Sequence, residues 1–172
     1  MKFNPTLLVV ILAATTAFAG TDTGTNTVTN SQASAKLKIR KAITLTNNTD
    51  LDFGGVVVSG VAASSMTLTP ANVLSIAGAD ILATFNPTTA GAFTVGGTAN
   101  ATYAINAIPG INITSTALPS TPVGVTFTTS KATGTLDGTG SDTFTVGGTA
   151  SIPAPVTGGD YSGTFSVTVL YN

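Results

Sequence analysis

The chain ends on the stretch YSGTFSVTVLYN, residues 161–172, in which every second residue from Tyr161 to Tyr171 is apolar or glycine. Alternate residues of a strand face the same side of a sheet, so a period of two predicts a strand with one buried face. Phe, Val and Tyr also favour strands over helices. We therefore predict a half-buried strand that continues to the end of the chain.

Short apolar segments of the same kind recur before this stretch, separated by Gly, Pro, Asn and Asp residues that favour turns. Residues 71–83 are the least regular part, and Gly78 divides them, which favours two short strands over a helical turn. Frequent short strands between turn residues are typical of sandwiches and barrels. We predict an all-β fold, an immunoglobulin-like antiparallel β-sandwich of about nine to eleven short strands.

The first regular stripe lies near the N-terminus. It consists of Ala35, Leu37, Ile39, Ile43 and Leu45, with Lys41 interrupting the apolar parity. This pattern predicts a half-buried strand from Ala35 to Leu45, with a bulge or a crossing between two sheets at Lys41. The cations of the opposite parity indicate the solvated face of an edge strand or a surface for an anionic glycan or lipid headgroup. A turn is predicted next, at residues 47–50.

The sequence FTVGGTA occurs twice, at residues 93–99 and 144–150. We predict that the Gly-Gly pair of each copy supplies the positive φ angles of a tight hairpin. The repeat is then either a duplicated structural unit or, as we favour, one hairpin solution used twice.

Charged residues make up only 8% of the chain, which has no His, no Cys and no Trp, and all seven of its acidic residues are Asp. Most acid–base, nucleophile and transition-metal chemistry is therefore excluded, and we predict no enzyme, no catalytic residue and no cofactor. A net charge of −1 also argues against nucleic acid as a partner. Asp137 and Asp142 are candidates for a Ca²⁺ site, with a hairpin turn as the alternative, and Asp50 and Asp52 are a second candidate pair.

The N-terminus has the pattern of a secretory signal peptide: Lys2, then an apolar run from Leu7 to Ala14, then the small residues Ala17 and Ala19. The run is too short to span a bilayer as a helix, which takes about 20 residues. We predict a signal peptide at residues 1–19, a polar flexible arm at 20–34 and a single β-sandwich domain at 35–172. The protein is expected to be exported to the periplasm, the cell surface or the medium.

Several segments resemble one family of secreted bacterial proteins, the domain-of-unknown-function family four-four-zero-two. They are LDFG (51–54), AFTV (92–95), ATYAI (101–105), GTLDGTGSDTFTVGGTASI (134–152) and YSGTFSVTVLYN (161–172). The resemblance covers residues 35–172. It implies no enzymatic activity and supplies no catalytic residues.

The terminal segment also resembles the last strand of chaperone–usher pilins and of spore-coat-protein-U-like subunits. The resemblance implies that Phe165, Val167, Val169 and Tyr171 take part in assembly, and that a neighbour's N-terminal arm completes the sandwich by strand addition. The chain lacks the cysteine pair of many such pilins, and its arm at 21–30 is polar. Donor candidates are therefore residues of the Ala35–Leu45 stripe, although we favour that stripe as the domain's own first strand; they are Leu37, Ile39, Ile43 and Leu45.

Three functions follow as hypotheses. The first is an exported, non-enzymatic structural or adhesive protein of the cell surface, such as a subunit of a fibre or pilus. Its partners would be copies of itself or other envelope and surface components. The second is an extracellular module that binds a surface glycan or Ca²⁺. The third is a small outer-membrane β-barrel, since alternating strands in a chain of this length suit that architecture.

Overall fold

The computed structural model describes residues 32–115 and 121–172, so the predicted signal peptide and most of the predicted arm lie outside the described residues. The chain divides into two units, Met1–Leu37 and Lys38–Asn172, and every strand belongs to the second. The described residues form thirteen strands and no helix, and so contain no helix able to span a membrane. The strands are β1 (Thr44–Thr49), β2 (Gly55–Val58), β3 (Ser64–Leu68), β4 (Leu74–Ala77), β5 (Ile81–Phe85), β6 (Gly91–Gly96), β7 (Thr102–Ile105), β8 (Ile111–Ser115), β9 (Val123–Thr129), β10 (Thr133–Thr135), β11 (Ser141–Ile152), β12 (Tyr161–Ser162) and β13 (Val169–Tyr171).

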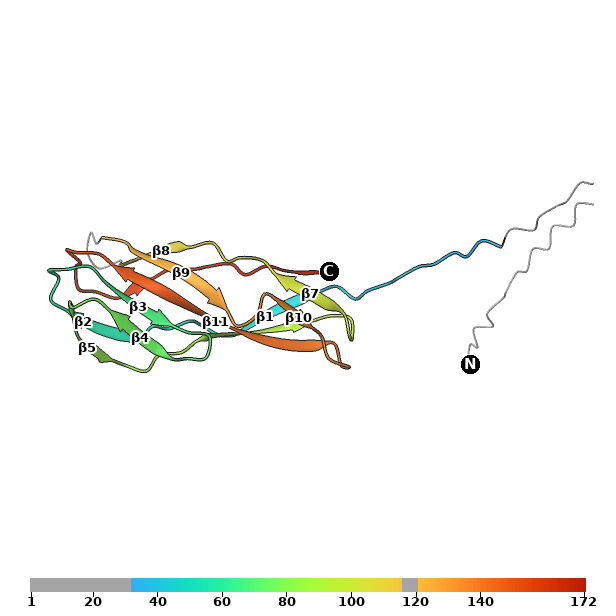
Figure 1. Cartoon of the computed structure of the whole chain (residues 1–172), viewed down its shortest axis with the longest axis horizontal. Coiled ribbons are helices and arrows are strands. Elements are labelled where there is room, and N and C mark those ends of the chain that lie inside the picture. Colours follow the sequence, from blue (N-terminus) through green and yellow to red (C-terminus); the bar gives the residue numbers. More distant parts are fainter. Residues whose placement is uncertain (1–31, 116–120) are drawn as a thin grey trace, which may run out of the picture. The chain divides into compact units, whose positions relative to one another are not determined.

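All pairings between these strands are antiparallel, which confirms the all-β, sandwich-like prediction. The main sheet has the order β1-β6-β11-β9-β8-β12; β3 joins it by pairing with β11, and β4 pairs with β3. A second sheet has the order β10-β7-β13, and β2 pairs with β5 in a separate ribbon (Figure 1). The strand count exceeds the predicted range, in part because the single strand predicted over 161–171 is divided into β12 and β13. The predicted division of residues 71–83 at Gly78 is confirmed by β4 and β5.

The long strand β11 organises the main sheet. Its first half pairs with β6 and its second half with β3 along the same edge, while β9 pairs along the opposite edge. The change of partner falls at Gly147 and Gly148, where Val146 is opposite Gly91 of β6 and Gly148 is opposite Leu68 of β3. β11 therefore connects the part of the main sheet that contains β6 and β1 to the part that contains β3 and β4.

The hairpins predicted at the FTVGGTA repeats are wrong. The second copy lies within the continuous strand β11, and the strands that flank the first Gly-Gly pair, β6 and β7, belong to different sheets. None of the four repeat glycines has a positive φ angle. A Cβ atom on Gly147 would instead collide with the backbone of β3, and one on Gly148 would lie 2.6 Å from the Thr126 carbonyl oxygen. Close packing of neighbouring backbones thus accounts for the Gly147-Gly148 pair.

The first strand is shorter than predicted. β1 begins at Thr44, and residues 35–43 form no strand, because β1 pairs with β6 only as far as Gly96, which is opposite Thr44. The turn predicted at residues 47–50 is also wrong, since β1 continues to Thr49. The register shift in β1 lies between Asn47 and Thr49 and not at Lys41. A strand needs a partner as well as a pattern, and Leu37 and Ile39 have none here.

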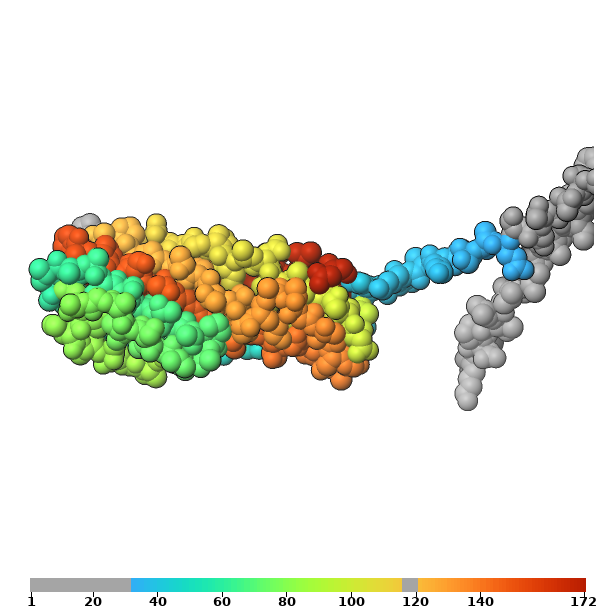
Figure 2. Space-filling view, viewed as in Figure 1, coloured from blue at the N-terminus to red at the C-terminus, as the bar shows by residue number. Residues whose placement is uncertain are grey.

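The core of the domain consists of two clusters of buried side chains. The first contains Phe93, Val95, Tyr103, Ile105, Leu136, Phe144 and Val146. The second contains Met66, Val123, Val125, Ala150 and Ile152. Phe127 packs against both clusters and so connects them. The face seen in Figure 2 is formed by the β3–β5 region at its lower left, by β8 and β9 along its upper side and by residues around β10 and β11 at its lower right.

Candidate functional site

An apolar groove with a volume of about 580 Å³ opens onto the second core cluster. All five buried residues of that cluster line it. Protein interiors have few voids larger than a water molecule, so a hollow of this size over core side chains is unusual. The groove is the strongest candidate site in the described part of the chain.

Two segments far apart in the sequence form the walls of the groove. One runs from Asp50 to Val56 and includes the start of β2, and the other runs from Val156 to Gly163 and on to Phe165. The second wall belongs to the C-terminal segment, which runs along β8 and β7 (Figure 1). Within the described residues β12 pairs only with β8, and β13 only with β7, so this segment lies at the edge of both sheets.

The backbone of the C-terminal segment has unpaired groups along that edge. The Asn106 amide donates to the Thr168 carbonyl at 2.9 Å, and the Asn172 amide donates to the Thr102 carbonyl at 3.2 Å. In an antiparallel ladder the residues that bond to one neighbour alternate with those that face away from it. Val169 therefore directs its N–H and C=O away from β7, towards an edge on which no described strand pairs.

The four predicted assembly residues of the C-terminal segment occupy two places. Phe165 lines the groove and packs on Phe127, with ring centroids 4.3 Å apart. Val167, Val169 and Tyr171 pack against the first core cluster and are half-buried. The predicted inward face of this segment is thus confirmed, whereas its role in assembly stays a prediction.

The rim of the groove carries three carboxylates, Asp50, Asp52 and Asp160. The side-chain amide of Asn47 donates from Nδ2 to Asp50 Oδ1 at 2.6 Å, and the Gly54 backbone N–H donates to Asp52 Oδ1 at 2.8 Å. No ion pair involves any of the three within the described residues. The rim is therefore a negatively charged border around an apolar floor.

The four predicted donor residues are divided by the start of β1. Ile43 and Leu45 pack against the first core cluster of their own domain, as the interpretation of a first strand requires. Leu37 and Ile39 are 85% and 81% exposed, and neither belongs to a strand. Of the four predicted donor residues, the structure therefore leaves Leu37 and Ile39 free for another contact.

Arg40 and Lys41, which follow these side chains, are held against Tyr171 of β13 and against Thr98. The Lys41 N–H donates to Thr98 Oγ1 at 2.6 Å, and the Tyr171 hydroxyl donates to the Lys41 carbonyl at 2.9 Å. The Arg40 guanidinium lies 4.8 Å from the centroid of the Tyr171 ring, which is a cation–π distance. Lys41 is thereby fixed beside Tyr171 of β13, and the C-terminus that follows lies away from β2 and β5 (Figure 1).

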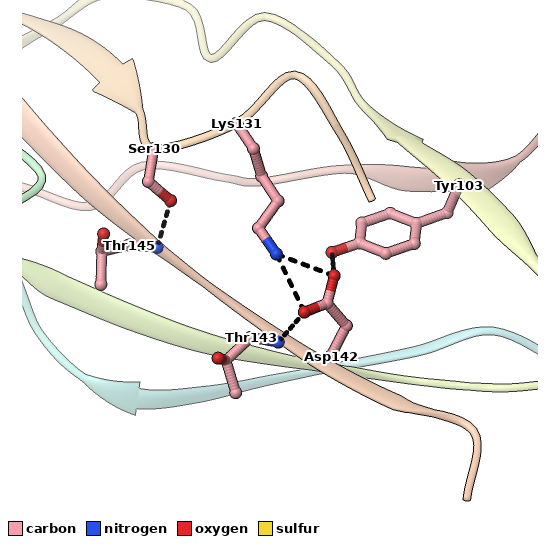
Figure 3. A network of polar contacts seen from close by, with 6 residues as sticks. All are labelled: Tyr103, Ser130, Lys131, Asp142, Thr143 and Thr145. Carbon is pink, nitrogen blue, oxygen red and sulfur yellow. Dashed lines mark hydrogen bonds and ion pairs between the residues drawn. The ribbon is translucent and has the colours of Figure 1, made fainter. Parts of the chain in front are cut away.

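A polar network away from the groove joins β7, β11 and the loop between β9 and β10 (Figure 3). Lys131 Nζ contacts both carboxylate oxygens of Asp142, at 2.8 and 2.9 Å, and the Tyr103 hydroxyl donates to Asp142 Oδ2 at 2.9 Å. Partial burial raises the pKa of Asp142, but the hydrogen bonds from Lys131, Tyr103 and the Thr143 amide outweigh it and leave that pKa below its ordinary value. Burial, and then the Asp142 carboxylate, raise the pKa of Tyr103. The arrangement is a structural tie between β11, β7 and the end of β9.

The two Ca²⁺ candidates have separate surroundings. Asp137 lies in the turn between β10 and β11, where its Oδ1 accepts the Thr139 and Ser141 amides at 2.8 and 2.9 Å. These bonds, with the Ser141 amide first, lower the pKa of Asp137. Asp142 instead faces Lys131. No group of three or more acidic, His or Cys side chains able to hold a metal occurs in residues 32–115 and 121–172, and the Ca²⁺ site stays a prediction.

Sequence reasoning missed the groove and the Lys131–Asp142 pair. The floor residues Val123, Val125 and Met66 alternate with polar or small residues in the sequence, but a period of two does not tell whether another layer covers them. Lys131 and Asp142 meet because Ser130 is opposite Thr145, with the Ser130 amide donating to the Thr145 carbonyl at 2.8 Å. The sequence does not reveal this register between β9 and β11, and so it does not reveal the ion pair.

Comparison with known proteins places this geometry in a family. No curated protein and no solved structure matches the chain. Neither comparison therefore confirms the resemblance to pilin subunits. Residues 43–171 match the model of the family described as "Domain of unknown function (DUF4402)", and this match spans the groove, its rim and both core clusters. The chain therefore belongs to the family of domains of unknown function DUF4402.

Proposed function

We propose that the chain is an exported, non-enzymatic structural protein of the cell surface that assembles with copies of itself by strand addition. The observation that carries this proposal is the apolar groove beside the unpaired edge of the C-terminal segment. An unpaired strand edge is a template for another strand, and an apolar groove beside it gives the added strand a place to bury side chains. The absence of His, Cys and Glu from the sequence supports the non-enzymatic part.

The test is the physical state of the predicted mature form, residues 20–172. We expect sedimentation velocity to show species larger than the monomer that grow with protein concentration, and negative-stain electron microscopy to show linear particles. A strict monomer across the concentration range, with no association with cells, would contradict the proposal.

A binding module is the second candidate, because the volume of the groove also lies within the range of ligand sites, about 300–1,000 Å³. Isothermal titration calorimetry with Ca²⁺ and a glycan array on the same preparation test it. Saturable binding by a protein that stays monomeric would favour the module over the assembling subunit.

A further inference from the structure

Exposed hydrophobic side chains are concentrated in residues 57–85, which lie at the left end of the domain in Figure 2. This stretch contains six of the nine large hydrophobic side chains that are exposed in the described residues: Val57, Val61, Val73, Ile76, Leu82 and Phe85. We call the surface of residues 57–85 the apolar patch. We propose that it binds the apolar patch of a second copy around a two-fold axis, with Leu82 near that axis. This contact adds no strand, so it goes beyond the proposed function.

The ribbon of β2 and β5 carries the centre of the apolar patch. Its inner side chains Val56 and Ile81 pack against the second core cluster. Val57 follows Val56 in the strand and so faces the opposite side, where it is 44% exposed. Leu82 is the residue that the register shift between β2 and β5 leaves without a partner, and it is 67% exposed. The outer face of the ribbon is therefore an apolar surface in contact with solvent.

The apolar patch carries no exposed charge. Asp80 is the only charged residue in the sequence from 53 to 130, and it is 4% exposed. Its carboxylate is turned into the loop after β2, where it accepts the Ser59 hydroxyl and the backbone N–H groups of Gly60 and Val61. In a two-fold contact the same surface faces itself, so any exposed charge meets a like charge. The apolar patch is free of this repulsion.

The same absence of charge disfavours a membrane as the partner. Surfaces that bind lipid headgroups combine apolar side chains with Lys or Arg, which anionic lipids attract. The sequence from 53 to 130 contains no Lys, Arg or Trp. A second copy of the chain therefore matches the chemistry of the apolar patch better than a lipid surface does.

The size of the apolar patch is sufficient for a contact between two proteins. Among residues 57–85 only Ser64, Met66, Leu68 and Asp80 are buried. A standard interface uses about 20–30 residues of each partner. The residues between the large hydrophobic side chains are mostly Ser, Thr, Ala and Gly, whose small side chains leave a smooth surface. The apolar patch can therefore supply an interface without rearrangement of the fold.

The strands of the apolar patch also lack the features that keep copies of a β protein apart. Within the described residues β4 pairs only with β3, and β5 pairs only with β2, so both have a free edge. Free edges are usually protected by charged side chains or proline. The sequences of β4 and β5, LSIA and ILATF, contain neither. A second copy that covers this surface shields the unprotected strands from other chains.

The first experiment places a charge at the centre of the contact in the predicted mature form, residues 20–172. Leu82→Asp changes an exposed side chain, so its unfolding transition should match that of the wild type. We expect sedimentation velocity to show self-association weakened by about a hundredfold or more, because a two-fold contact contains the change twice. The control Thr133→Asp adds the same charge at an exposed position of β10, outside the apolar patch, and should associate like the wild type.

The second experiment separates a direct contact from damage to the fold. Leu82→Lys alone should associate as weakly as Leu82→Asp, because like charges then meet at the axis. An equal mixture of the two variants should associate again, since unlike charges face each other in the mixed dimer. A mixture that stays as weak as its components would overturn the contact at Leu82.

The outcomes distinguish this contact from the proposed strand addition. Linear particles that persist in Leu82→Asp, with their side-by-side association lost, would support both. A wild type that forms only dimers, which Leu82→Asp abolishes, would support the contact and contradict strand addition. Association of Leu82→Asp that equals that of the wild type would overturn the contact alone. A wild type that stays monomeric but sediments with phosphatidylcholine vesicles, when Leu82→Asp does not, would overturn it in favour of a membrane surface.

Discussion

Replacing Gly147 by alanine tests the reading of β11 as one continuous strand that is closely packed where it changes partners. A Cβ atom at this position would collide with the Leu68 carbonyl oxygen and lie 2.6 Å from the Thr69 carbonyl carbon and 2.7 Å from the Pro70 nitrogen. Ordinary contacts of a Cβ atom lie at 3.4–4 Å. The obstacle is backbone, so no side-chain rotation relieves it, and the end of β3 must move.

The cost of that movement follows from what β3 carries. Leu68 is 1% exposed and Met66 is buried beside it, so a shift of β3 disturbs the packing of both side chains. Forcing extra atoms into a packed core costs about 1–3 kcal/mol. We expect Gly147→Ala to lower the free energy of unfolding by about 2–3 kcal/mol, near the upper end of that range, because backbone must give way.

Urea unfolding followed by circular dichroism measures this change. With a slope of about 2 kcal/mol per molar urea, the middle of the usual range, the midpoint should fall by about 1–1.5 M. Gly138→Ala is the matched control, because a Cβ atom there meets nothing within 4 Å, and its effect should stay within about 0.5 kcal/mol. Gly97→Ala should fall between the two, since the obstacle includes the hydroxyl end of the Tyr171 side chain. A midpoint for Gly147→Ala no lower than that of Gly138→Ala would refute the close-packing argument.

Three further changes test the core and the polar network. Tyr103→Phe removes the hydrogen bond to Asp142 and should lower the free energy of unfolding by about 1–2 kcal/mol in urea, and an unchanged midpoint would count against the network. The pKa of Asp142 in the folded protein lies below its ordinary value of 3.8. The contacts of its carboxylate therefore stabilise the protein above pH 3.8, and this stabilisation is lost as the pH falls through the folded-state pKa. In an acid titration, Asp142→Asn should show a shallower loss of stability than the wild type. Leu68→Ala should cost about 2–5 kcal/mol, whereas Leu82→Ala, at a position 67% exposed, should cost less than about 0.5 kcal/mol, and similar costs for both would contradict the burial assigned here.

The candidate site could be predicted from the sequence only in part. The alternation at residues 161–171 correctly places Phe165 and Val167 on the inward face. The stripe at Ala35–Leu45 identifies Leu37 and Ile39, but not that the strand stops short of them. The groove itself could not be predicted, because it lies between two segments that are far apart in the sequence, near Phe53 and near Tyr161, and meet over the second core cluster.

The sequence by itself determined the fold class and the facing of most side chains, because a period of two is a local property of an extended chain. Met66 and Leu68 of β3 and the division of residues 71–83 at Gly78 follow from such local patterns. Only the tertiary structure decided which strands pair. The two FTVGGTA copies show why: the same seven residues contain a strand end in one copy and the middle of β11 in the other. Strand pairing depends on partners that are distant in the sequence. β11 continues through Gly147 and Gly148 because β9 pairs with both residues and β3 pairs with Gly148. In the first copy the strand, β6, ends at Gly96.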